Sequence, residues 1–225
     1  MIDHKKISAM RIFLSIPLFV LLTSAGCKKE KLGSPLSYFP LDEGKEWCYE
    51  ASINGDGEPF AQSNWKIEGD TVIDGKTYKL MTNYGEPYKA IREEGGDFYK
   101  VKVTNLVINT KEELHFLKTT NPDGAAWEQV FDQFKYEFSQ VLLPEFSFGG
   151  QTWKEVIEVK ALLFTKDQNG QFKPLIDAST DESSYAMYYF AKGIGIVYMS
   201  EPSAFNQFSS FVYTVSNEMK LVDCP

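Results

Sequence analysis

Few residues of this chain have the chemistry of a catalyst. Of its two histidines, His4 lies near the N-terminus and His115 lies in an alternating apolar and polar segment. Adjacent carboxylates occur at Glu93-Glu94 and at Asp181-Glu182, and paired carboxylates hydrolyse glycosides when a suitable distance separates them. With 31 acidic residues in the chain, however, adjacent pairs arise by chance. We therefore expect His115 to be structural, and a carboxylate-dependent hydrolase is the weakest of our functional interpretations.

The short motifs of common enzymes are missing from the sequence. It has no Gly-x-Ser-x-Gly nucleophile elbow, no His-Glu-x-x-His helix and no Gly-x-x-x-x-Gly-Lys phosphate loop. Residues 54–58 and 167–170 offer oxygen ligands, but neither segment matches a calcium loop, and hairpin turns use the same residue types. We expect no catalytic residue, no metal site and no cofactor.

One segment, Phe205-Asn206-Gln207-Phe208, has the composition of a ligand contact. Aromatic faces can stack on a sugar, and amide groups can form hydrogen bonds with it. The alternative, which the general tendency of apolar side chains to be buried favours, is that Phe205 and Phe208 cover one end of the core.

Composition and charge define the class of protein. The chain has 225 residues, of which 43% are hydrophobic and 24% are charged, as in globular proteins. Its formal net charge is −8, and no run of basic residues occurs after residue 31. Such a surface repels phosphate backbones, so nucleic acid is excluded as an expected partner.

The N-terminal residues have the order of a secretory signal. Lys5, Lys6 and Arg11 precede an apolar run over residues 12–22, and small residues follow at 23–26. This run is too short to cross a hydrocarbon core of ~30 Å as a permanent helix. We expect export of the chain and removal of residues 1–26.

Ala25-Gly26-Cys27 resembles the lipobox of bacterial lipoproteins, in which the cysteine receives a diacylglycerol thioether. Ser24 stands where that motif commonly carries leucine. The resemblance implies a lipid on Cys27 and a membrane anchor; a cleaved ordinary signal peptide is the alternative. Lys28 occupies the position where aspartate resembles an inner-membrane retention signal, which favours the outer membrane and leaves its face open. Residues 27–37 are expected to form a flexible tether.

Strand patterns dominate residues 38–225, which we interpret as a single β domain. Asp74-Gly75 lies between two strand-like segments and suits a type I′ turn, whose central residues both need φ > 0. The expected strands cover residues 47–53, 60–67, 71–73, 76–78, 88–92, 98–103, 113–118, 138–143, 156–165, 172–176, 185–190, 194–199, 211–216 and 220–224. Those at 185–190 and 211–216 are apolar on both faces.

One segment departs from this pattern. Trp127, Val130, Phe131 and Phe134 have the i, i+3, i+4, i+7 spacing of a helical apolar stripe, and Asn121-Pro122 suits a helix start. We expect one short helix near 122–135. The fold class is thus mainly β, an antiparallel meander forming a barrel or strongly curved sheet.

The remaining cysteines, Cys48 and Cys224, lie in the first expected strand and at the end of the last. First and last strands are neighbours in a closed meander, and the periplasm oxidises exposed pairs of thiols. We therefore expect a disulfide between them; two separate buried thiols are the alternative.

Tyr38-Phe39-Pro40-Leu41, followed by Gly44 and then Trp47-Cys48-Tyr49, resembles the start of a group of uncharacterised bacteroidete outer-membrane lipoproteins. Their opening pattern is Tyr-Phe-Pro-Leu and Gly-x-x-Trp-x-Tyr, and the likeness returns at residues 69–78, 96–99, 150–153 and 193–198. The resemblance implies an antiparallel β fold and an envelope location, but no activity.

Three functional interpretations follow from these observations. The first is a non-catalytic envelope lipoprotein that binds a partner, such as an envelope protein or a glycan, or helps to assemble a complex. The second is a carrier whose barrel holds a lipid or other apolar ligand, which requires an internal cavity. The third is the carboxylate-dependent hydrolase.

Overall fold

The computed structural model describes residues 37–53, 59–104, 107–108, 113–175, 185–202 and 216–224. Within these ranges all the regular secondary structure is β-strand. No segment there forms a helix able to cross a membrane. The strands are β1 (Glu46–Ile53), β2 (Ala61–Ile73), β3 (Lys76–Asn83), β4 (Glu86–Glu94), β5 (Asp97–Thr104), β6 (Val107–Ile108), β7 (Leu114–Lys118), β8 (Ala126–Val130), β9 (Phe134–Phe148), β10 (Gln151–Lys166), β11 (Phe172–Pro174), β12 (Ala186–Ala191), β13 (Gly195–Pro202) and β14 (Ser216–Val222).

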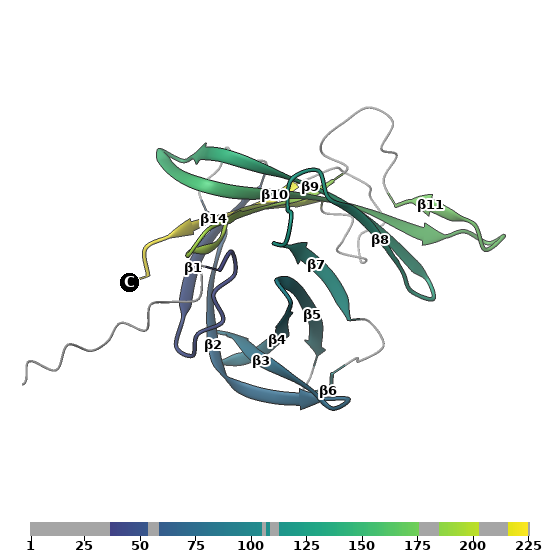
Figure 1. Ribbon diagram of the computed structural model, residues 1–225, viewed down its shortest axis with the longest axis horizontal. Coiled ribbons are helices and arrows are strands. Elements are labelled where there is room, and N and C mark those ends of the chain that lie inside the picture. The colour runs from purple at the N-terminus through teal and green to yellow at the C-terminus, as the bar shows by residue number, and fades with distance from the viewer. Residues whose placement is uncertain are drawn as a thin grey trace, which may run out of the picture. The chain divides into compact units, whose positions relative to one another are not determined.

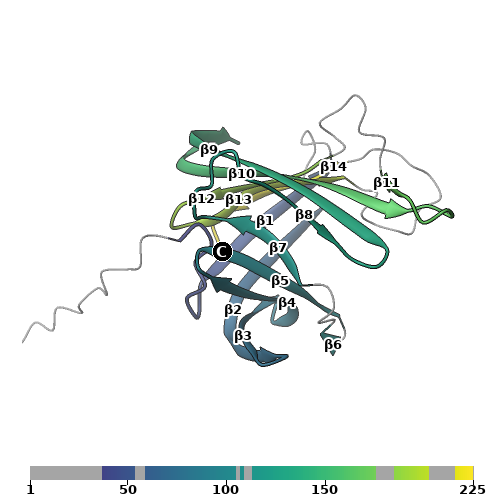
Figure 2. The same cartoon turned by 45° about the vertical axis from the view of Figure 1, so that its right-hand side comes forward.

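These strands form one antiparallel sheet that curves until it is nearly a closed barrel (Figures 1 and 2). The order runs from β5 through β4, β3, β2 and β1 to β14, then through β13, β12, β10 and β9 to β8. β7 pairs with β5, so β7 and β8 lie at the two ends of the sheet. The predicted fold class, a mainly β antiparallel barrel or strongly curved sheet, is confirmed.

The tight turns agree with the residues that form them. Asp74 and Gly75 have φ of 49° and 77°, the positive values that the predicted type I′ turn between β2 and β3 requires. Gly195 begins β13 at φ 111°, and a Cβ there would lie 2.7 Å from Nε1 of Trp47. The indole of Trp47 therefore approaches this glycine too closely for a side chain to fit.

The helix expected near 122–135 is wrong. Residues 126–130 form strand β8, and Phe134 begins β9, which pairs with β8 in an antiparallel hairpin. Along β8, Trp127 and Gln129 are partly buried, whereas Val130 is 56% exposed. The i, i+3, i+4, i+7 spacing therefore does not mark one buried face. Asn121 has φ of 53°, which belongs to a turn and not to a helix N-cap.

The residues before β1 fill one end of the barrel. Phe39 is 2% exposed and its ring contacts the rings of Trp47, Phe98, Phe116 and Phe190 at centroid distances of 5.4–6.1 Å. We call this the plugged end; β1 and β5 begin there, and β14 ends there. The opposite end, where β1 ends and β4 begins, is called the far end.

The core has an inner and an outer part. The inner core fills the barrel and includes Trp47, Tyr49, Phe98 and Phe190. A second cluster lies on the other face of β10, β12 and β13, where the ring of Phe146 stacks on Tyr189 at 3.9 Å. The expectation that the strand near 185–190 is apolar on both faces holds for β12. Residues 211–215 lie outside the described part of the chain.

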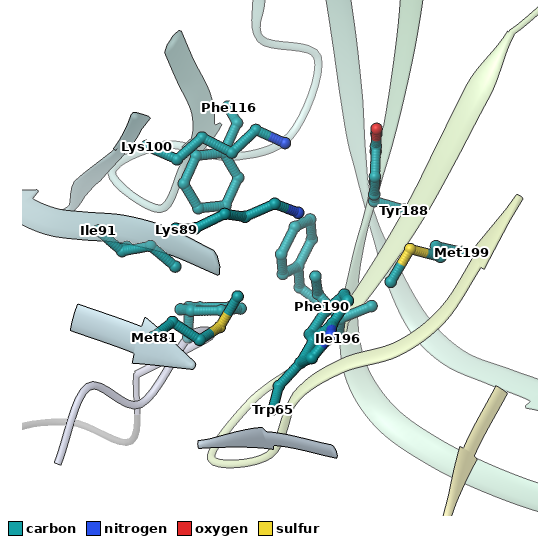
Figure 3. A pocket seen from close by; sticks show the side chains of 11 residues that line it. Trp65, Met81, Lys89, Ile91, Lys100, Phe116, Tyr188, Phe190, Ile196 and Met199 are labelled. Carbon is teal, nitrogen blue, oxygen red and sulfur yellow. The ribbon is translucent and has the colours of Figure 1, made fainter. Parts of the chain in front are cut away.

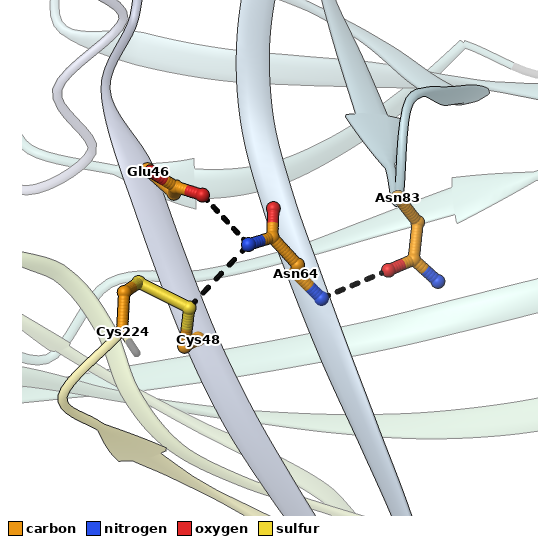
Figure 4. Close-up of a disulfide and its surroundings, with 5 residues drawn as sticks. All are labelled: Glu46, Cys48, Asn64, Asn83 and Cys224. Carbon is orange, nitrogen blue, oxygen red and sulfur yellow. Dashed lines mark hydrogen bonds between the residues drawn. A yellow bond between two sulfur atoms is a disulfide. The ribbon is translucent and has the colours of Figure 1, made fainter.

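Cys48 and Cys224 form the predicted disulfide (Figure 4). Their Cα atoms are 5.2 Å apart, and Cys48 pairs in register with Val222 on β14. The amide of Asn64 on β2 donates to Sγ of Cys48 and to Glu46. The first and last strands are therefore hydrogen-bonded neighbours that a covalent bond also joins.

Side chains bridge the seam between the two ends of the sheet. Gln129 on β8 accepts from the backbone N–H of His115 and donates to the carbonyl of Glu113, and Trp127 Nε1 donates to the carbonyl of His115. Gln140 on β9, which is 2% exposed, accepts from the N–H of Lys118 and donates to its carbonyl. Amide side chains thus replace part of a strand ladder along β7.

Candidate functional site

Among the described residues, a small pocket lies inside the barrel between the Phe39 plug and the far end (Figure 3). Its cavity has a volume of about 20 Å³, enough for roughly one water molecule. Most of the wall is apolar, and the polar groups come from three strands. The lining residues are Phe39, Trp65, Met81, Lys89, Ile91, Lys100, Phe116, Tyr188, Phe190, Ile196 and Met199.

A β-bulge lies directly before Lys89, which lines the pocket. The β3–β4 register shifts between Met81 and Thr82, so Tyr88 has no paired residue on β3. The alternation of inward-facing and outward-facing residues is therefore interrupted at Tyr88. The Nζ atom of Lys89 lies 4.3 Å from the ring centroid of Tyr88 and 5.1 Å from that of Trp65. These cation–π contacts hold the ammonium group over aromatic faces inside the barrel.

Lys100 reaches the same space from β5. It pairs in register with Ile91, which shares the inner face of the sheet. Its Nζ lies 5.1 Å from the ring centroid of Phe116 and 5.3 Å from that of Tyr188. In Figure 3 the Lys89 and Lys100 side chains run side by side, with both amines pointing toward β12 and β13.

A carboxylate lies on the opposite wall. The hydroxyl of Tyr188 on β12 donates to Oε1 of Glu201 on β13 at 2.7 Å. Burial, and then the charge of Glu201, raises the pKa of Tyr188 well above its ordinary value. Tyr188 therefore stays a neutral hydrogen-bond donor at physiological pH, and Glu201 supplies the negative charge of the site.

The two amines titrate differently. Burial and the neighbouring charge of Lys89 lower the pKa of Lys100 to about 7, although Glu201 partly opposes them. Burial also disfavours the charge of Lys89, but Tyr88 and Glu201 outweigh it and raise its pKa. Both side chains keep some exposed area, while their ammonium groups are surrounded by protein atoms. At neutral pH, Lys89 is charged and Lys100 is partly neutral.

Glu93 and Glu94 do not form a catalytic pair of carboxylates. Glu93 and Glu94 are successive residues of β4, so their side chains point to opposite faces, and Glu94 binds Arg92 at 2.6 Å. Asp181-Glu182 lies outside the described residues. Arg92, with Tyr78 and Lys76, also binds Glu113 and lowers its pKa to about 2 despite burial. A carboxyl with that pKa is not a general acid near neutral pH.

His115 lies in β7, as expected of a structural residue. Its ring stacks on Tyr99 at 4.7 Å and lies 5.2 Å from Trp127. Burial lowers its pKa, although Asp97 Oδ2 lies 3.3 Å from Nε2 and opposes this effect. Nε2 forms no hydrogen bond within the described residues.

The other predicted site residues have simpler outcomes. Cys27, the segment Phe205-Asn206-Gln207-Phe208 and residues 54–58 lie outside the described residues. Asp167 accepts the backbone N–H groups of Asn169 and Gln171, which is a turn arrangement. Among the described residues, Glu46, Cys48 and Cys224 could approach a metal, but the disulfide removes both thiolates.

The amine pocket was not predicted from the sequence. Lys89 and Lys100 each lie two residues from an inward-facing apolar residue, Ile91 and Phe98, and this period-2 placement is the signal that could have found them. A lysine between apolar residues of a strand normally faces solvent, and the Tyr88 bulge is not encoded by a recognisable motif.

Comparisons with known proteins assign no family. No family model and no curated protein matches this chain. Two solved structures show a distant likeness, both at 12% sequence identity. One is a presumed lipoprotein of Parabacteroides distasonis, with a TM-score of 0.42 over 84% of this chain and 98% of the other. The second is a presumed exported protein of Bacteroides fragilis with a YmcC-like fold, with a TM-score of 0.43 over 83% and 97%.

Proposed function

We propose that this chain is an exported lipoprotein, tethered to the outer membrane through Cys27, whose barrel binds a small anionic ligand without chemical turnover. The signal-like order of residues 1–27 supports export and lipidation. The amine pocket supports the binding role. The negative charge of the chain argues against nucleic acid as a partner, whereas an envelope protein or a glycan remains a candidate partner of the outer surface.

The observation that carries the binding role is the charge imbalance of the pocket. Two amines, Lys89 and Lys100, line an apolar and aromatic pocket, and one carboxylate, Glu201, lies beside it on the hydroxyl of Tyr188. A buried cation without a partner is costly, and here the cost appears as the lowered pKa of Lys100. A bound carboxylate or phosphate group would supply the missing negative charge and restore the proton on Lys100.

The size of the cavity argues against the lipid carrier. Pockets that enclose drug-sized ligands have volumes of ~300–1,000 Å³, whereas this cavity has about 20 Å³ among the described residues. The pocket thus suits one acidic group that displaces a water molecule. Because Phe39 fills the plugged end, the ligand is proposed to enter from the far end.

Binding of simple anions tests this proposal. Titration of the purified protein with lactate, followed by NMR or calorimetry, should show saturable binding. Lys100→Met should abolish it, whereas Lys154→Met, at an exposed lysine of β10, should not. Because the ligand needs protonated Lys100, affinity should fall about tenfold between pH 6 and pH 8. Binding that is absent, or unchanged in Lys100→Met, would contradict the proposal.

Lipidation is tested separately in cells. Labelling with an alkyne fatty acid should mark the wild-type protein, and Cys27→Ser should remove the label and release the protein from the membrane fraction. A matched Cys48→Ser variant should keep the label, because Cys48 lies in β1 and is joined to Cys224. An unlabelled wild-type protein found in the soluble fraction would refute the anchor.

A further inference from the structure

We propose that Cys48 and Cys224, when their disulfide is reduced, bind a zinc ion together with the carboxylate of Glu46. The site lies at the plugged end of the barrel and shares no residue with the amine pocket. The cysteine pair would therefore have two states, an oxidised one that closes the barrel and a reduced one that holds a metal.

Three ligand atoms converge beside the disulfide (Figure 4). The sulfur atoms of Cys48 and Cys224 and a carboxylate oxygen of Glu46 all lie within 4.8 Å of one another. Glu46 and Cys48 are two residues apart on β1, so their side chains lie on the same face of the strand. Zinc ligands lie about 2.0–2.3 Å from the metal, and hence roughly 3–4 Å from each other. Only small movements are needed for these three atoms to surround an ion.

The exposed cysteine can supply the main movement. The two sulfur atoms must separate when a metal takes the place of the S–S bond. Cys224 lies beyond Val222, the last residue of β14, and is exposed, whereas Cys48 is 6% exposed and lies within the β1 ladders. The exposure of Cys224 also leaves the disulfide open to attack by a dithiol reductant.

The donor set favours zinc over calcium or magnesium. Calcium and magnesium take oxygen ligands, whereas zinc accepts thiolate sulfur and carboxylate oxygen together. Two thiolates and one carboxylate leave the fourth position of a tetrahedral site to a water molecule.

A polar side chain already orients two of the three ligands. The side-chain amide of Asn64 donates to Oε1 of Glu46 at 2.6 Å and to Sγ of Cys48 at 3.5 Å. The backbone N–H of Asn64 in turn donates to Oδ1 of Asn83 at 3.0 Å. Hydrogen bonds of this kind fix the direction of metal ligands and stabilise the negative charge of a bound thiolate.

Each proposed step balances. A dithiol transfers two electrons to the Cys48–Cys224 bond, gives its two protons to the cysteine sulfurs and becomes a disulfide itself. Zinc then binds both sulfurs as thiolates and displaces the two thiol protons to solvent, without a change in its own oxidation state. An oxidant that forms the S–S bond again removes both thiolates and releases the ion.

Titration with cobalt(II), a spectroscopic substitute for zinc, tests the site. The mature chain carries Cys27→Ser, which leaves Cys48 and Cys224 as its only cysteines. It is reduced with a phosphine, the reagent is removed under argon, and cobalt chloride is added. We expect a thiolate-to-cobalt charge-transfer band and the visible bands of a tetrahedral site, saturating at one metal per chain and lost when zinc is added. The oxidised protein should show neither feature.

Variants identify the ligands. Cys224→Ser should remove the tetrahedral cobalt bands. Glu46→Gln should weaken zinc binding by about tenfold or more, whereas Glu145→Gln, at an exposed position of β9, should leave it unchanged.

A stability measurement covers the case in which a variant fails to fold. Zinc should raise the midpoint of thermal unfolding of the reduced protein, because it binds the native state, and should leave the oxidised protein unchanged. Tetrahedral bands that persist in Cys224→Ser, or zinc affinity unchanged in Glu46→Gln, would place the metal elsewhere and overturn the proposal. A reduced protein without these bands, whether folded or unfolded, would overturn it as well.

Discussion

At the scale of single residues, burial of the Lys100 amine lowers the stability of the folded protein. Its amine lies inside the barrel with Lys89 nearby, and the hydrogen bond between Tyr188 and Glu201 leaves one carboxylate for two amines. Lysines are rarely buried without a partner of opposite charge, because burial of an uncompensated charge is strongly unfavourable. Residues that cost stability in the free protein are common where a ligand later supplies the missing partner.

This cost makes a prediction about pH. The pKa of Lys100 is about 7 in the fold and about 10.5 when the chain is unfolded, so between these values the unfolded state binds one more proton. The free energy of unfolding should therefore rise with pH from about 7 upward. Denaturant titrations at pH 7 and pH 9.5 should show this rise, and Lys100→Met should make it smaller. An equal rise in both proteins would show that another group causes it.

Residue-level prediction succeeded for the cysteines and failed for the amines for a physical reason. Cys48 and Cys224 could be paired because closure of a meander makes its first and last strands neighbours, whatever their register. Lys89 lies two residues from inward-facing Ile91, but the bulge at Tyr88 interrupts the alternation on its other side. Because lysines in strands normally face solvent, the strand pattern gave too little reason to place this one inside.

At the scale of elements, the seam between β7 and β8 is the unusual feature. The two strands are not paired as a ladder, and Gln129, Gln140 and Trp127 supply the hydrogen bonds that neighbouring backbone would have made. Buried backbone groups need such partners, so these side chains complete the wall of the barrel.

Gln140→Leu should be strongly destabilising. The substitution keeps an apolar side chain of similar size but removes the partners of the Lys118 N–H and carbonyl and of the Pro122 carbonyl. With about 1–3 kcal/mol for each buried group left without a partner, we expect a loss on the order of 2–4 kcal/mol. Chemical denaturation should show this loss, whereas Gln62→Leu, at an exposed position of β2, should change stability by less than about 0.5 kcal/mol. A small effect at Gln140 would mean that water or a backbone shift replaces these bonds.

Most strands could be predicted from the alternation of apolar and polar residues and from turn residues. The wrong helix near 122–135 shows that this pattern fails for short aromatic segments. Aromatic residues at Trp127, Phe131 and Phe134 suit either period, and a five-residue strand is too short for the alternation to be decisive. The hairpin partner β9 decides the matter, because it offers a complete ladder to residues 126–130. Such tertiary pairing is invisible in local sequence.

At the scale of the whole molecule, closure depends on the contact between β1 and β14. Six residue pairs from Cys48–Val222 to Ile53–Asn217 join these strands, and the disulfide adds a covalent link between positions 176 residues apart. Without this contact, the first strands would be separated from the β12–β14 part of the sheet.

Removal of the disulfide should destabilise the fold without changing its topology. In the chain-entropy model, a loop of 176 residues corresponds to about 5 kcal/mol, which is an upper value. The double variant Cys48→Ala/Cys224→Ala should unfold at lower guanidinium concentration, with an unchanged far-ultraviolet circular dichroism spectrum. Addition of a reductant should move the wild-type midpoint toward that of the variant and leave the variant unaffected. Equal midpoints for the two oxidised proteins would show that β1–β14 pairing alone closes the barrel.

The plug formed by Phe39 also has a mechanical consequence. If Cys27 carries the proposed lipid, a pull on that anchor would reach the folded domain through Ser37 and Phe39, whose ring is packed among Trp47, Phe98, Phe116 and Phe190. The Cys48–Cys224 bond lies at this same end and would share the load between the first and last strands. Force from the proposed anchor would thus be borne first at the plugged end, by the Phe39 ring that also lines the amine pocket.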